Sequence, residues 1–63
     1  MSIEYILFHA DFDENFSEVF YIEDDKSLLS YFNEDEHFIK PLLENGLYEG
    51  EWESYHLIKI TGL

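Results

Sequence analysis

Carboxylates are the groups that this sequence sets out in a regular pattern. In the segment 47–54, "LYEGEWES", Glu49, Glu51 and Glu53 alternate with other residues. If the segment is extended, these side chains project from one face about 6.6 Å apart, which is twice the rise per residue of a strand. No Lys or Arg occurs from residue 41 to 58 to neutralise them. The spacing is comparable to that of nucleic-acid phosphates and predicts a DNA-like surface; the alternative is an edge strand protected from aggregation by charge.

A second acidic cluster follows two aromatic residues. Glu34, Asp35 and Glu36 are consecutive, and Tyr31 and Phe32 come shortly before them. Aromatic groups beside acids supply the desolvated anchor that charge alone lacks at a protein interface. We therefore expect the three carboxylates of this cluster, together with the three glutamates of the row, to contact a protein partner.

The segment "DFDENFSEVFYI" partly matches the calcium-binding loop of EF-hands. Asp11, Asp13 and Asn15 match the first three ligand positions. Phe16 replaces the glycine of the sharp turn, and Ile22 replaces the bidentate glutamate. The segment is better explained as the acidic turn of a hairpin, so we predict neither a metal site nor a cofactor.

Few residues here are suited to catalysis. The sequence has no Cys and no G-x-S-x-G motif, and its only groups that titrate near neutrality are His9, His37 and His56. His9 and His56 fall on strands expected to be neighbours, so a pair is conceivable. A general acid also needs a pocket that raises its pKa, and 63 residues leave little room for one. We predict that the protein is not an enzyme.

The charge balance narrows the choice of partner. The chain has 15 Asp and Glu against 3 Lys, for a net charge of -12. Direct binding to nucleic acid or an anionic membrane depends on Lys and Arg, so both are excluded and a basic protein partner is expected. Acidity also favours solubility, but charge of this size destabilises a compact chain, which favours a functional reason. The sequence shows neither a signal peptide nor a membrane span, so a cytoplasmic location is expected.

The elements that must hold these residues follow from the apolar pattern. Residues 3–10 and 17–23 are predicted to form a hairpin of two strands, and 47–60 contains a last strand beside the first. Two helices are expected at about 26–33 and 35–45, the second capped by Asn33 and Glu36; their shared apolar face is Leu28, Phe32, Ile39 and Leu43. The prediction is one α+β domain, residues 1–63, with a three-stranded antiparallel sheet in the order β-β-α-β and one or two helices on one face.

Twelve of the 63 residues are aromatic. A three-stranded sheet with one helical layer cannot cover so many rings, and its second face is left bare. We therefore expect a homodimer formed through the bare sheet face or the helices.

Small size, absence of Cys, acidity and aromatic content resemble phage-encoded DNA-mimic proteins that disable host restriction, repair, CRISPR or transcription machinery. The order of an acidic hairpin, "SLLSYF" after "EDDK", and "YHLIKI" as closing strand is similar to the smallest phage inhibitors of uracil-DNA glycosylase, over roughly half of the chain. Those inhibitors are dimers in which the helix and its mate frame an apolar pocket for a leucine of the enzyme. The matching positions here are Tyr31, Phe32 and 34–36, so the resemblance implies that these residues contact the partner.

The resemblance implies an inhibitor that occupies the DNA-binding cleft of a host protein in the host cytoplasm. Uracil-DNA glycosylase is the first target to consider, followed by CRISPR, restriction and transcription proteins. An antitoxin or immunity protein that neutralises a basic toxin remains the alternative, because such a protein would also be acidic.

Overall fold

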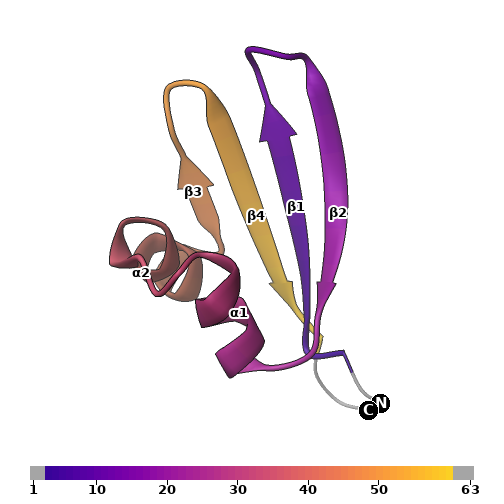
Figure 1. Cartoon of the computed structure of the whole chain (residues 1–63), viewed down its shortest axis with the longest axis vertical. Helices are drawn as coiled ribbons and strands as arrows, with labels where there is room; N and C mark the ends of the chain where they lie inside the picture. Colours follow the sequence, from indigo (N-terminus) through magenta and orange to yellow (C-terminus); the bar gives the residue numbers. More distant parts are fainter. Residues whose placement is uncertain (1–2, 61–63) are drawn as a thin grey trace.

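The computed structural model describes residues 3–60, which form a four-stranded antiparallel sheet with two helices against one face (Figure 1). The sheet order is β2-β1-β4-β3. The α+β class, the antiparallel sheet and the two helices are as predicted, whereas the prediction of three strands is wrong. The elements are β1 (Tyr5–Asp11), β2 (Phe16–Ile22), α1 (Asp25–Tyr31), α2 (Glu36–Asn45), β3 (Leu47–Glu49) and β4 (Glu53–Lys59).

The additional strand arises because the segment 47–54 turns back on itself. Gly50 N donates to Glu53 O at 2.8 Å, which closes a hairpin between β3 and β4. A Cβ built on Gly50 would lie 2.8 Å from the Tyr48 hydroxyl oxygen, so the glycine permits this close approach. β4 consequently has β1 on one side and β3 on the other, which confirms that the last strand lies beside the first.

The two faces of the sheet differ in what covers them. On the helix-covered face, Tyr5, Leu7 and Ile22 are at most 5% exposed and pack with Leu28 and residues of α2. β-strand side chains alternate, so the intervening residues point to the other face. The second strand therefore has Phe20 and Ile22 on one face and Val19 and Tyr21 on the other, as predicted.

The second face, here called the bare face, has no helix over it. Its middle consists of Ile6, Phe8, Val19, Tyr21, His56 and Ile58. Four of these apolar residues are exposed: Phe8 to 40%, Val19 to 45%, Tyr21 to 69% and Ile58 to 49%. No carboxylate lies in this central part of the face, although the chain has 15.

Side-chain caps define both helices. Asp24 caps α1 by accepting from Ser27 N at 2.8 Å, and this hydrogen bond lowers the pKa of the Asp24 carboxyl. Asp35, not the predicted Asn33, caps α2 by accepting from His37 N at 3.0 Å. Gly46, at φ 73, ends α2 in the left-handed conformation, and its N–H donates to Leu42 O.

The helices are separated by residues 32–35, close to the expected place, and Pro41 lies inside α2. Asn33 and Glu34 both have left-handed backbone angles, φ 54 and φ 58, and redirect the chain. This break changes the helical phase, so the single apolar face predicted across both helices is only partly right. Leu28, Phe32 and Ile39 are buried, but Leu42 is buried in place of Leu43, which is 55% exposed.

Among the described residues, no helix has the length and apolar composition needed to cross a membrane.

A candidate interaction surface at the hairpin end

Both hairpin turns lie at one end of the sheet, beyond the helices (Figure 1). We call this surface, residues 11–16 and 49–53, the hairpin end. Its two halves are joined directly, because Phe12 N donates to Trp52 O at 2.8 Å and Asp11 pairs with Glu53 in the sheet. Residues distant in the sequence therefore form one continuous surface.

The β1–β2 turn is built by one of its own carboxylates. Asp11 Oδ1 accepts from Asp13 N at 3.0 Å and from Glu14 N at 3.1 Å, and Asn15 completes the turn at φ 56. These contacts are those of an acidic hairpin turn. Within residues 3–60, no group of three or more His, Asp or Glu side chains is arranged to hold a metal ion.

Three aromatic side chains project from the hairpin end. Phe12 is 57% exposed, Phe16 42% and Trp52 62%. Large exposed aromatic groups are unusual on a monomeric surface and are typical of the anchor residues of protein interfaces. The residue pattern did not single out these three, because alternation alone cannot tell that both turns project beyond the helices.

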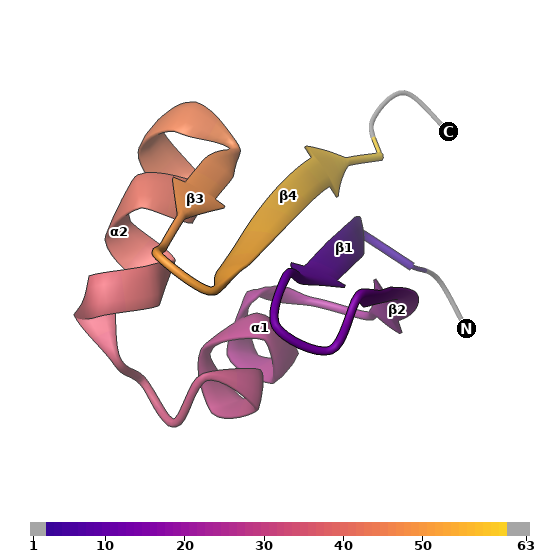
Figure 2. The same ribbon diagram turned by 90° about the horizontal axis from the view of Figure 1, so that it is seen from above.

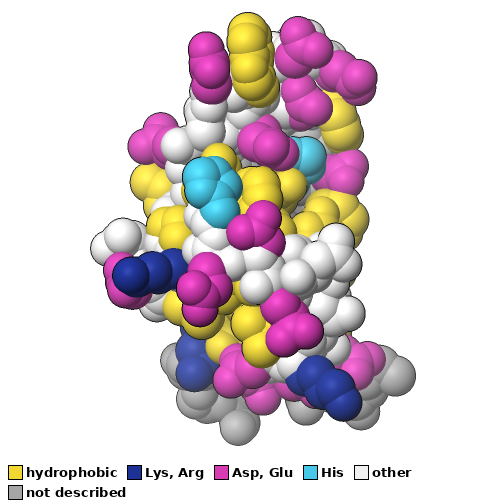
Figure 3. Space-filling view, turned by 60° about the vertical axis from the view of Figure 1, so that its left-hand side comes forward, with side chains coloured by type: hydrophobic (Ala, Val, Ile, Leu, Met, Phe, Trp, Pro, Cys, Tyr) yellow, Lys and Arg dark blue, Asp and Glu magenta, His cyan; other side chains and the backbone are white. Residues whose placement is uncertain are grey.

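Carboxylates surround these aromatics and are not neutralised locally. The hairpin end carries Asp11, Asp13, Glu14, Glu49, Glu51 and Glu53, and no lysine. Figure 3 shows hydrophobic and acidic groups together at this end of the molecule, with the Lys side chains in its lower part. Within residues 3–60, the one carboxylate of the hairpin end that contacts a basic side chain is Glu53, whose Oε1 lies 3.2 Å from His9 Nε2.

The predicted single row of Glu49, Glu51 and Glu53 is wrong in its geometry. Glu49 ends β3 and pairs with Ser54, Glu51 lies in the turn, and Glu53 begins β4. Since Glu53 is adjacent to Ser54 on the same strand, Glu49 and Glu53 point to opposite faces of the sheet. The three carboxylates share the hairpin end but do not form a line of phosphate-like spacing.

Glu53 instead organises a network on the helix-covered face. Its Oε1 lies 3.2 Å from His9 Nε2 and accepts from the Tyr55 hydroxyl at 3.2 Å. The rings of His9 and Tyr55 stack at 4.5 Å. Burial, together with the charges of Glu53 and Glu18, raises the pKa of Tyr55. His56 points to the bare face, so the two histidines do not form a pair.

Tyr31 and Phe32 lie close to this network. With Asn33, Asp35, Phe38 and Tyr55 they line an open hollow of about 620 Å³. Phe32 is only 7% exposed and contacts Phe38 and Tyr55, so it belongs to the core, whereas Tyr31 is 40% exposed. Burial and then the charges of Glu18 and Glu53 raise the pKa of Tyr31.

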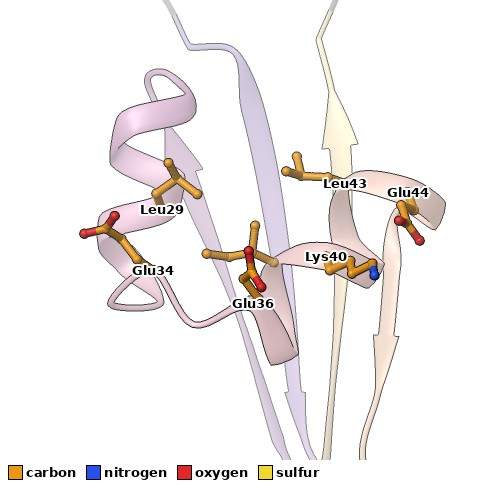
Figure 4. A pocket seen from close by; sticks show the side chains of 7 residues that line it. Leu29, Glu34, Glu36, Lys40, Leu43 and Glu44 are labelled. Atoms are coloured by element: carbon orange, nitrogen blue, oxygen red, sulfur yellow. The ribbon is translucent and has the colours of Figure 1, made fainter.

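The acidic cluster at 34–36 is divided between two places. Asp35 faces the hollow just described, whereas Glu34 and Glu36 line a groove between the two helices (Figure 4). The groove has a volume of about 580 Å³, with an apolar floor that includes Leu29 and Leu43. Unlike the hairpin end, it contains a cation, since Lys40 lies on its rim beside Glu44.

Comparison of the chain with family models, with curated proteins and with solved structures found no match.

Proposed function

We propose that the protein is a non-enzymatic inhibitor that mimics DNA and binds the basic cleft of a nucleic-acid-processing protein through the hairpin end. The observation that supports this proposal is the combination of three exposed aromatic side chains with six carboxylates and no lysine across residues 11–16 and 49–53. The negative field steers the protein to a basic surface, and the aromatic groups provide desolvated contacts.

In this proposal the DNA-like charge comes from the cluster of carboxylates at the hairpin end and not from a linear row of glutamates. Asp13, Glu14 and Glu51 are exposed, and their carboxylates make no hydrogen bond or ion pair with another described residue, although the backbone N–H groups of Asp13 and Glu14 donate to Asp11. Their desolvation upon binding is therefore compensated only by groups of the partner. The backbone beneath them is held by the Asp11 contacts and by the sheet, so the charges are presented on an ordered surface.

Uracil-DNA glycosylase is the first target to test, because of the resemblance in segment order. The protein is added to the glycosylase acting on uracil-containing DNA, and both uracil excision and binding kinetics are measured. We expect loss of excision, competition with DNA and weaker binding at higher salt. Absence of binding would exclude this target.

The broader proposal is tested by capture from bacterial lysate, followed by DNA competition for each captured protein. Recovery of proteins that do not handle nucleic acid, and no others, would overturn the mimic. Capture of one basic toxin that does not touch DNA would establish the antitoxin alternative.

A pair of matched triple variants locates the binding surface. Asp13→Asn, Glu14→Gln and Glu51→Gln together remove three charges from the hairpin end. Glu23→Gln, Glu34→Gln and Glu44→Gln together remove the same charge elsewhere. We expect the first triple variant to slow association with the captured partner by about tenfold or more at low salt, and the second to change it far less. Equal effects would show that net charge alone matters, and a larger effect of the second would move the site to the helices.

A further inference from the structure

The outer edge of β2 is the longer of the two edges of the sheet. β2 is the terminal strand in the order β2-β1-β4-β3, has seven residues, Phe16–Ile22, and pairs with β1 on its inner side. The other edge strand, β3, has three residues and packs against α2. β2 contains neither Lys nor Pro, the residues that commonly protect an edge. Its outward backbone groups are therefore available to an added strand.

Glu18 is the one charged residue of this strand. It pairs with His9 of β1, so it points to the helix-covered face, where it is half-buried. The His9 ring contacts Glu53, and the Glu18 carboxylate has no hydrogen bond or ion pair within residues 3–60. Burial and then the charge of Glu18 raise the pKa of Tyr31, so this carboxylate lies near α1. The middle of the edge thus presents a carboxylate without a counter-ion.

A depression of about 530 Å³ lies beside the second half of the edge, between residues 20–23 and Ser27, Ser30 and Tyr31 of α1. The rings of Phe20 and Tyr31 lie 5.0 Å apart at this place. Figure 2 shows β2 at the border of the sheet, with α1 beneath the sheet rather than beside it. Aromatic rings, hydroxyls and the Glu23 carboxylate together suit a long side chain with an apolar stem and a cationic head.

Carboxylates also bound this edge at both ends. Asp13 and Glu14 precede β2, and residues 23–25 follow it, before the first lysine of the chain, Lys26. In antiparallel pairing, a second copy would set its acidic turn beside residues 23–25 of the first, and each chain has a net charge of -12. Charge complementarity therefore favours a basic segment of a different protein at this edge.

We propose that the outer edge of β2 binds an extended basic segment of a partner protein, which adds to the sheet as a further antiparallel strand with an arginine or lysine opposite Glu18. Backbone hydrogen bonds supply the affinity of such an added strand, and alternate side chains supply its selectivity. A second cation opposite Ile22 would reach the depression on the same face. This site goes beyond the proposed function, because it requires neither the hairpin end nor a partner that handles nucleic acid.

A synthetic peptide tests this edge directly. The probe has the length of β2, seven residues, and consists of valine and threonine with arginine at its first and fifth positions. In the antiparallel register these arginines lie opposite Ile22 and Glu18. We expect saturable binding below about 1 mM, with slower amide exchange in Phe16–Ile22 measured by nuclear magnetic resonance. A peptide with glutamate in place of both arginines should not bind.

Two methylated forms of the probe distinguish strand addition from simple attraction of charge. Methyl groups on alternate backbone nitrogens remove the donors along one side of an extended peptide and leave those of the other side. We expect one form to lose binding and the complementary form to keep it. Equal binding by both forms, unprotected β2 amides, or absence of binding at about 1 mM would each overturn strand addition.

Glu18→Gln should weaken binding of the probe by about fivefold or more, because a charge-assisted hydrogen bond is lost. Glu44→Gln removes the same charge from an exposed position of α2 and should change binding by less than about twofold. Tighter binding by Glu18→Gln would show that this carboxylate keeps strands away, and would overturn its pairing with a cation. Concentration-dependent protection of the β2 amides without the probe would show that a second copy occupies the edge, and would overturn a different protein as the occupant.

Discussion

Near the helices, carboxylates accept hydrogen bonds from neighbouring groups, whereas at the hairpin end most carboxylates face solvent. Asp24 and Asp35 cap the helices, and Asp25 accepts from the Tyr5 hydroxyl. All three lysines belong to this half of the molecule, in α1, in α2 and at the end of β4. The carboxylates of Asp13, Glu14 and Glu51 neither accept a hydrogen bond from a described residue nor pair with a lysine.

The aromatic residues differ in the same way. Tyr5 and Phe32 are buried in the core between the sheet and the helices, while Phe12 and Trp52 are more than half exposed at the hairpin end. The same residue types therefore stabilise the fold in one region and are left available for a partner in the other. The comparison predicts that substitutions should affect stability at one end and association at the other.

The largest expected difference is between Phe32→Ala and Trp52→Ala. Phe32 contacts Phe38 and Tyr55 in the core, so its truncation should lower the free energy of unfolding by about 3 to 5 kcal/mol. A loss of that size is enough to unfold a small domain. Trp52→Ala should change it by about 0.5 kcal/mol or less, because the side chain is 62% exposed. Urea denaturation followed by circular dichroism measures both, and a large loss for Trp52→Ala would end the distinction.

A smaller effect is expected at alkaline pH. The hydrogen bond to Asp25, burial and the nearby carboxylates raise the pKa of Tyr5 to about 12. The unfolded chain titrates near 10, so the folded state holds this proton more tightly and its contribution to stability is complete below about pH 10. We expect the urea midpoint to fall as the pH rises from about 10 to about 12.

Two tyrosine variants identify the source of this alkaline loss. Tyr5→Phe should reduce it but not abolish it, since the pKa values of Tyr31 and Tyr55 are also raised. Tyr21→Phe is the control, because Tyr21 is 69% exposed on the bare face. An unchanged alkaline loss in Tyr5→Phe would show that the Asp25 contact does not stabilise the fold.

The smallest expected effect is that of salt on stability. Raising the ionic strength from about 0.01 M to about 0.15 M shortens the Debye length from about 30 Å to about 8 Å and should stabilise the unmodified chain. We expect a gain of no more than about 1 kcal/mol, since exposed charges are well solvated. The hairpin-end triple variant should show less of this gain than the matched triple variant in thermal melts at both salt concentrations. An equal reduction would mean that repulsion is not concentrated at the hairpin end.

The sequence predicted those elements whose signals are local. The alternation of side chains along a strand correctly predicts which face of the sheet Val19, Phe20, Tyr21 and Ile22 occupy. The break between the helices also lies close to its expected place. The turn at Gly50 was missed, because the alternation of "YEGEWE" fits a continuous strand equally well. What decides between them lies outside the segment, because the Tyr48 ring packs against His37 and Phe38 of α2 and β4 pairs with β1.

The candidate residues were predicted by type better than by arrangement. Acid and aromatic side chains do lie together, but Phe32 is in the core and Glu53 serves His9 and Tyr55. The sequence could not show that Asp11 and Asp13 lie beside Trp52, because the connection depends on β1 pairing with β4. The clusters of the first and last thirds of the chain meet only in the folded sheet.

The order of the strands also determines when the protein can fold during its synthesis. β1 pairs with β4 along its full length, so that Tyr5 lies beside Lys59. Contacts between such distant segments form slowly, because a long loop must close before they stabilise anything. While β4 is still within the ribosome, β1 and β2 have no third strand and their apolar residues remain accessible. The acidic turn between these strands leaves the ribosome with them, so the exposed apolar residues of this hairpin are accompanied by the charges of Asp11, Asp13 and Glu14.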